Sequence, residues 1–85
     1  MTAVEIEINI RSKIPSYRQL ADQIEAAIAA GEYGPDEAIP SLKQLKDRTG
    51  LAQGTIQHAI MVLEGKGIVY TVRGRGTFVT PQGHG

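Results

Sequence analysis

Two helical patterns follow each other closely in the middle of this 85-residue chain, and they restrict its fold more than any other feature. The first, at about residues 41 to 49, is short; Ser41 can cap its first turn while the Gln44 side chain bonds back to the Ser41 backbone. Gly50 ends this pattern, and only a few residues separate it from a longer one at about residues 53 to 66. We interpret the pair as a helix-turn-helix, which projects the start of its second helix from the protein surface.

One helical pattern and one alternating segment precede this pair. The stretch from Ser16 to Ala30 has apolar residues at helical spacing, and Gly31 stands where a left-handed residue closes a helix. Upstream, the segment VEIEINI alternates apolar and polar residues, which predicts either a strand with one buried face or an ordered arm over residues 1 to 14. The apolar face of that strand would carry Val4, Ile6, Ile8 and Ile10.

A β-hairpin is expected after the helices. Gly67 followed by Ile68 is typical of a helix that ends on a left-handed glycine, and the β-rich runs IVYTV and TFVT are joined across RGRG. The predicted fold class is therefore α+β: a winged helix-turn-helix with three helices plus a C-terminal β-hairpin wing, over residues 15 to 81. Residues 82 to 85 are expected to form a flexible tail.

The composition argues against several function classes. The chain has no cysteine, and His58 and His84 are far apart with no carboxylate at metal-ligand spacing around them. No nucleophile, base and orienting group occur together, so we expect no catalytic residue, no metal and no cofactor. The apolar stretches are too short to cross a bilayer and the N-terminus does not resemble a signal peptide, so we expect a cytoplasmic protein without a membrane partner.

The charges are unevenly distributed along the chain. The formal net charge is zero, but residues 1 to 38 carry three basic and seven acidic residues, whereas residues 39 to 85 carry six basic and two acidic ones. A net charge of +4 on the second part predicts an anionic partner there.

The start of the third helix is the candidate for base recognition. Its apolar face is expected to carry Ile56, Ala59, Ile60 and Leu63. The positions left on the solvent side are Gln53, Gly54, Gln57 and His58. Glutamine can accept from and donate to adenine at once, so we interpret this face as a reader of base edges. Exposed glutamines are also common as ordinary solvated residues, and only the neighbouring basic residues favour the functional interpretation.

The hairpin tip and the second helix offer contacts to phosphate. Arg73 and Arg75 flank a glycine on the tip, where they can contact phosphates or enter a narrow minor groove. The alternative is that these arginines only keep the tip soluble. The start of the second helix, from Ser41 to Lys43, provides backbone amides that suit an anion, with Lys43 beside them. Lys46 and Arg48 are interpreted as solvated.

Three separated blocks resemble the N-terminal DNA-binding domain of GntR-type bacterial transcription regulators, over roughly residues 15 to 81. They are PSYRQLADQIEAAIAAGEYGPDEAIPSLKQL, TGLAQGTIQHAIMVLEGKGIV and GRGTFV. The resemblance implies a regulator, with a repressor favoured, that binds two-fold symmetric double-stranded operator DNA, with a homodimer forming on that site. It also implies that Lys43 stands at a phosphate-contacting position, Thr55 at a DNA-contacting one, and Gly76 at the wing tip.

The chain departs from the family pattern at three interface positions. Gln53 and Gln57 replace the usual arginines, and Ala52 replaces the usual serine or threonine cap of the third helix. The family usually continues into an effector-binding domain after the position of Pro81, so we expect either a minimal regulator or an excised domain. A winged helix that binds only other proteins is the alternative function.

Overall fold

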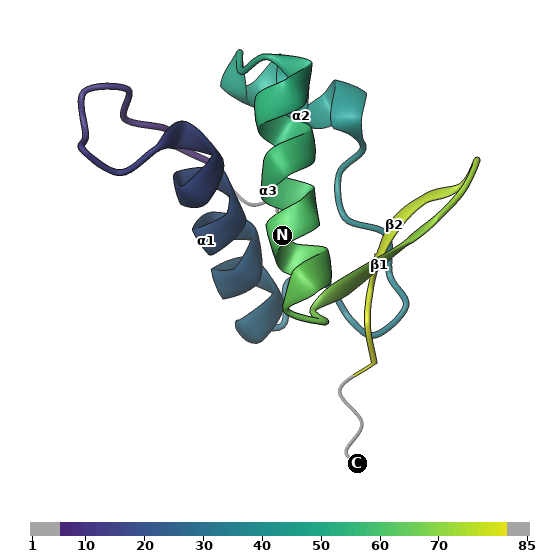
Figure 1. Cartoon of the computed structure of the whole chain (residues 1–85). Coiled ribbons are helices and arrows are strands. Elements are labelled where there is room, and N and C mark those ends of the chain that lie inside the picture. The colour runs from purple at the N-terminus through teal and green to yellow at the C-terminus, as the bar shows by residue number, and fades with distance from the viewer. Residues whose placement is uncertain (1–5, 82–85) are drawn as a thin grey trace.

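The computed structural model describes residues 6 to 81 and has the predicted order of elements (Figure 1). Its elements are α1 (Ser16–Ala29), α2 (Leu42–Thr49), α3 (Gln53–Gly65), β1 (Val69–Val72) and β2 (Gly76–Val79). Three helices and a two-stranded antiparallel hairpin confirm the α+β class and the winged helix-turn-helix architecture. The expected tail at residues 82 to 85 lies outside the described residues.

Local signals determine the helix ends. Ser41 caps α2 through both bonds of a capping box, and Gly50, with a φ of 73°, closes that helix in the left-handed conformation. At the end of α3, the Gly67 amide donates to the Glu64 carbonyl at 2.9 Å and the Ile68 amide donates to the Leu63 carbonyl at 3.0 Å. This pair of bonds is the Schellman arrangement that the sequence predicted, and it directs the chain from α3 into the hairpin.

The core lies where the three helices meet the hairpin. Its buried side chains include Leu20, Ile24, Ile39, Leu45, Ile56, Ala59, Leu63, Val69 and Val79. Helices α1 and α3 start at the same end of the molecule (Figure 1). Near that end the Tyr17 ring stacks on the His58 ring, with 3.7 Å between centroids, and at the other end Lys66 forms an ion pair with Glu25 at 3.0 Å.

The hairpin receives a third, shorter partner from the α1–α2 connection. The Asp36 amide donates to the Val79 carbonyl at 2.8 Å, the Val79 amide donates to the Glu37 carbonyl at 2.9 Å, and Ala38 forms a β-bridge with Phe78. The sequence predicted only a turn-rich connection here, since nothing local shows that it pairs with a strand forty residues away. The wing is therefore attached to the body along β2 as well as through α3.

A side-chain contact reinforces that attachment. The Tyr70 hydroxyl donates to the Asp36 carboxylate at 2.6 Å. This hydrogen bond, together with desolvation and the negative charge of Asp36, raises the pKa of Tyr70 above its ordinary value of 10.0.

The segment before α1 is an arm rather than a strand. No strand is present over residues 6 to 10, and Val4 lies outside the described residues. Ile6 and Ile8 pack against the core as expected, but the prediction for Ile10 was wrong, because its side chain is 81% exposed. The arm has no neighbouring strand within the described chain; two α1 side chains pair with its backbone instead.

Those two side chains are glutamines one turn apart. Gln23 accepts from the Glu7 amide at 2.9 Å and donates to the Glu7 carbonyl at 2.6 Å. Gln19 accepts from the Asn9 amide at 2.8 Å and donates to the Asn9 carbonyl at 2.9 Å. Each glutamine thus supplies the donor and the acceptor that a neighbouring strand would supply.

Candidate nucleic-acid interface

The start of α3 presents the residues that the sequence predicted for base recognition. Gln53, Gly54 and Gln57 are exposed, while Ile56 and Ala59 on the opposite side are fully buried. This helix face is therefore free to approach a partner without disturbing the core. Ala52 is the N-cap, with extended backbone angles and no side-chain cap bond, as its replacement of a serine or threonine predicted.

Two other predicted residues on α3 are placed differently from Gln57. His58 is exposed, but its ring lies against Tyr17 of α1, so it is turned toward the side of the helix that faces α1. Thr55 is half-buried in the first turn of α3. Neither arrangement has a local sequence signal, because Tyr17 is 41 positions before His58.

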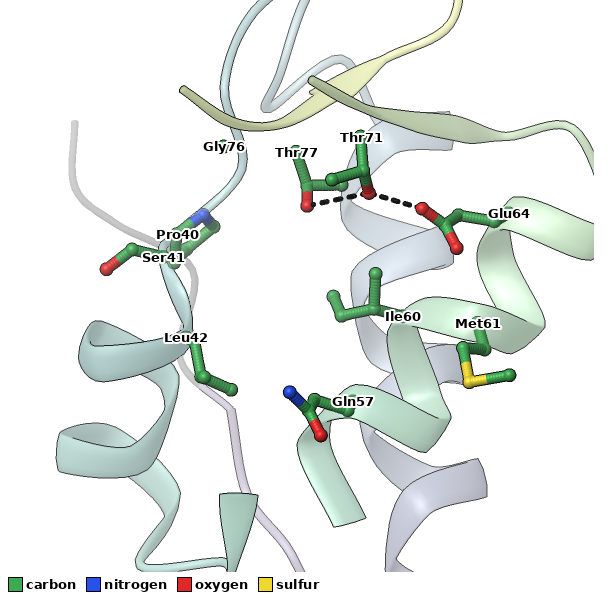
Figure 2. A pocket seen from close by; sticks show the side chains of 10 residues that line it. All are labelled: Pro40, Ser41, Leu42, Gln57, Ile60, Met61, Glu64, Thr71, Gly76 and Thr77. Carbon is green, nitrogen blue, oxygen red and sulfur yellow. Dashed lines mark hydrogen bonds between the residues drawn. The ribbon is translucent and has the colours of Figure 1, made fainter. Parts of the chain in front are cut away.

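A groove of about 430 Å³ separates α3 from the wing, and the start of α2 lines its third side (Figure 2). The Gln57 amide and the Leu42 side chain point toward one another across it (Figure 2). Met61, one turn after Gln57, is 64% exposed at its edge.

A short chain of hydrogen bonds crosses the floor of this groove (Figure 2). The Thr71 hydroxyl donates to the Glu64 carboxylate, and its oxygen lies 3.3 Å from the Thr77 hydroxyl oxygen. These bonds connect the second half of α3 to both strands of the wing. Sequence reasoning missed Glu64, Thr71 and Thr77, although Glu64 lies on the same side of α3 as Gln57, two turns later.

The start of α2 is partly occupied by its own cap. The Ser41 hydroxyl accepts from the Gln44 amide at 3.1 Å, and the Ser41 amide donates to the Gln44 side chain at 2.8 Å. Gln44 thus already satisfies the Ser41 amide, and the contact of Ser41 with DNA stays a prediction. The amides of Leu42 and Lys43 stay at the open end of the helix, and the Lys43 side chain is exposed beside them.

The wing tip is a three-residue turn that presents two cations. Arg73, Gly74 and Arg75 are all exposed, and the Arg75 amide donates to the Val72 carbonyl at 2.9 Å. Gly76 follows with a φ of 131°, a conformation that strains any L side chain. The one ion pair within residues 6 to 81 is Lys66 with Glu25, so neither wing arginine is neutralised by a described carboxylate.

The described residues contain no group of three histidine, cysteine, aspartate or glutamate side chains that could hold a metal ion. Across the same part of the chain, every helix is too short or too polar to cross a membrane. The polar side chains that line the groove are those of Ser41, Gln57, Glu64, Thr71 and Thr77, and the exposed cations Lys43, Arg73 and Arg75 lie on the elements that border it.

A family model described as "Bacterial regulatory proteins, gntR family" matches residues 6 to 79. The HTH-type transcriptional repressor NagR of Bacillus subtilis is 36% identical over 75 residues, which cover 88% of this chain and 31% of that protein. The mannosyl-D-glycerate transport/metabolism system repressor MngR of Escherichia coli is 37% identical over 65 residues, covering 76% of this chain and 27% of that protein. The chain thus spans about a third or less of the length of these two relatives, both of which are named as regulators and not as enzymes.

Solved structures resemble the whole fold. YtrA from Sulfolobus acidocaldarius, a GntR-family transcription factor, superposes with a TM-score of 0.84 at 34% identity, covering 93% of this chain and 83% of that one. The AraR(DBD), solved in complex with operator ORE1, superposes with a TM-score of 0.79 at 34% identity, covering 87% of this chain and 90% of that one.

Proposed function

Because the chain belongs to the gntR family of bacterial regulatory proteins, we propose that it binds a specific double-stranded DNA operator and regulates transcription as a repressor. One observation carries this proposal: the AraR(DBD), which was solved on its operator, has this fold at 34% identity over 87% of the chain. On this chain α3 carries exposed polar residues, and the wing arginines have no ion-pair partner among residues 6 to 81.

In the proposed complex, α3 enters the major groove with its first turns. Gln53 and Gln57 then reach base edges, and their amides suit adenine. Gly54 allows the helix backbone to approach closely, while Thr55 and His58 lie beside the reading face and limit how the helix is seated. These contacts supply the sequence preference.

The remaining predicted contacts supply affinity. Lys43, with the free amides at the start of α2, contacts phosphate on one side of the groove described above. Arg73, Arg75 and Gly76 place the wing against the backbone or the minor groove on the other side. Two copies bind one symmetric operator in the bacterial cytoplasm, and the chain acts without catalysis or cofactor.

Selection from a random duplex pool, followed by salt titration of the selected site, tests this function. We expect a symmetric operator whose log K falls linearly with log salt, because neutralised phosphates release counterions. Arg75→Ala should reduce the slope by about one unit and weaken all duplexes similarly, since phosphate contacts carry no base information.

Lys66→Gln is the matched control, because it removes one cation at the far end of α3 and only an exposed ion pair. If Arg75→Ala changed which sequence is preferred, the wing would be reading bases or groove width. A chain that binds no duplex even at low salt would be a protein-interaction module, and the proposed function would be wrong.

A further inference from the structure

The loop from Asn9 to Pro15, here called the arm loop, has a charge opposite to that of the chain segment around it. Residues 1 to 38 are net negative, yet residues 8 to 21 contain Arg11, Lys13 and Arg18 and no carboxylate. All three cations of the acidic half are thus gathered in and directly after one loop.

This loop is held in one conformation by its own hydrogen bonds. The Gln19 side chain donates to the carbonyls of Asn9 and Ile14 at 2.9 and 2.8 Å. Inside the loop, the Ser12 amide donates to the Asn9 carbonyl at 3.1 Å, and the Ile14 amide donates to the Ser12 hydroxyl at 3.0 Å. A loop that is fixed before binding loses less conformational entropy when it contacts a partner.

The side chains of this fixed loop nevertheless face solvent. Arg11 and Lys13 are exposed, and neither side chain has an ion-pair or hydrogen-bond partner among residues 6 to 81. The structure therefore presents two cations on an ordered loop that form no ion pair or side-chain hydrogen bond within the described fold.

The position of the arm loop indicates its partner. The loop projects beside the start of α1, at the same end of the molecule as the start of α3, and α3 lies between it and the wing (Figure 1). Tyr17, two residues after the loop, stacks on His58 near the start of α3. The loop thus flanks the reading helix on one side as the wing flanks it on the other.

We propose that the arm loop is a second phosphate-binding element, in which Arg11 and Lys13 contact the DNA backbone on the flank of α3 opposite the wing. The inference rests on the proposed function, because it requires α3 to lie in a major groove. The strands that border a major groove are about 12 Å apart, so an element beside α3 meets the strand that the wing does not reach.

The double variant Arg11→Gln/Lys13→Gln, titrated with salt on the selected operator, tests the inference. We expect the slope of log K against log salt to fall by about two units, with about an eightfold loss of affinity per contact at 0.1 M salt. In ethylation interference, the double variant should no longer be sensitive to phosphates on one flank of the operator. This flank is opposite to the one at which Arg75→Ala loses sensitivity. Circular dichroism should be unchanged, because neither side chain supports the fold.

Lys66→Gln is compared with the single variant Arg11→Gln, since each removes one exposed cation. If both reduced the slope equally, or if the double variant kept the slope and the interference pattern of the parent, the inference would be overturned while the proposed function stood. If the parent chain itself showed no salt-dependent binding, the proposed function would fail first, and the inference with it.

Discussion

Gln57 is the residue on which operator choice would depend most directly in the proposed complex. Its amide lies in the groove between α3 and the wing, opposite Leu42, and no core contact constrains it (Figure 2). Arginine is suited to guanine through two bonds to O6 and N7, whereas glutamine is suited to adenine. If Gln57 contacts a base in the proposed complex, a glutamine in place of the family's arginine favours adenine and leaves one cation fewer at that surface.

We predict that Gln53→Arg or Gln57→Arg shifts the preference of one operator position from adenine toward guanine. A good bidentate contact discriminates by about 1 to 3 kcal/mol, which is large enough to change the preferred base pair. The measurement is binding to operators varied one base pair at a time. Met61→Arg is the control, because it adds the same charge at a 64% exposed position one turn after Gln57.

Uniform tightening on every duplex by all three variants would contradict this prediction, since added charge alone would then explain the gain. A gain for guanine at a single position with Gln53→Arg or Gln57→Arg, absent with Met61→Arg, is the expected pattern.

At the residue scale, the sequence predicted the exposed face of α3 because helical spacing separates exposed from buried positions. Gln53, Gly54 and Gln57 are exposed for that reason alone. The stack of His58 on Tyr17 and the bond between Glu64 and Thr71 depend on how whole elements pack against each other. Residue spacing within one helix contains no information about such contacts.

At the scale of elements, α3 starts without a cap. Ala52 has the extended backbone of an N-cap residue but no side-chain acceptor. In α2, by contrast, the side chains of Ser41 and Gln44 form a capping box that pairs two backbone amides at the helix start. The start of α3 is therefore less stable than it would be with a capping side chain at position 52.

We predict that Ala52→Ser raises the free energy of unfolding by about 1 kcal/mol, because a serine hydroxyl can accept from an amide of the first turn. Urea denaturation followed by circular dichroism measures this change. Ala30→Ser is the control, since it adds a hydroxyl at the exposed C-cap of α1, where no free amide needs an acceptor. Equal stabilisation by both variants would contradict the capping argument.

Elements defined by local signals were predicted well, and elements defined by distant partners were not. Caps and left-handed glycines act within a few residues, so the helix and hairpin bounds follow from the sequence. The pairing of the arm with α1 requires two similar lengths. Two extended residues of the arm span about 6.6 Å, and four residues of α1 rise about 6.0 Å. Glu7 and Asn9 can therefore pair with Gln23 and Gln19, but no strand rule describes this pairing.

At the scale of the whole molecule, the described surface offers no strand edge at the arm for a second copy. Ile6 and Ile8 pack against the core, and the backbone of Glu7 and Asn9 is bonded to glutamine side chains. We predict that the protein is a monomer in solution and that two copies bind one duplex when the symmetric operator is added. Sedimentation velocity measures both states. A tight dimer without DNA would contradict the prediction.

The distribution of charge along the chain indicated only some of the cations that we propose to contact DNA. Comparing the two halves of the chain made Lys43, Arg73 and Arg75 candidates, and their contacts with DNA stay predictions. The same average concealed Arg11 and Lys13, because the carboxylates that outweigh them are separated from them in sequence. A cluster of charges indicates where an anion binds only after each charge has been assigned to a surface. That assignment requires the fold.

The pairing of the arm with α1 has a consequence for how related sequences should diverge. The bonds from α1 reach only the backbone of Glu7 and Asn9, so they constrain these two side chains only by excluding proline, which lacks the donor. The Asn9 side chain has one further role, because it accepts from the Arg11 amide at 3.0 Å, whereas Glu7 can otherwise be replaced freely. Gln19 and Gln23 must each donate and accept at once, a requirement that glutamate or lysine cannot meet. Over evolutionary time, substitutions should therefore accumulate on the arm while the two helical positions resist them.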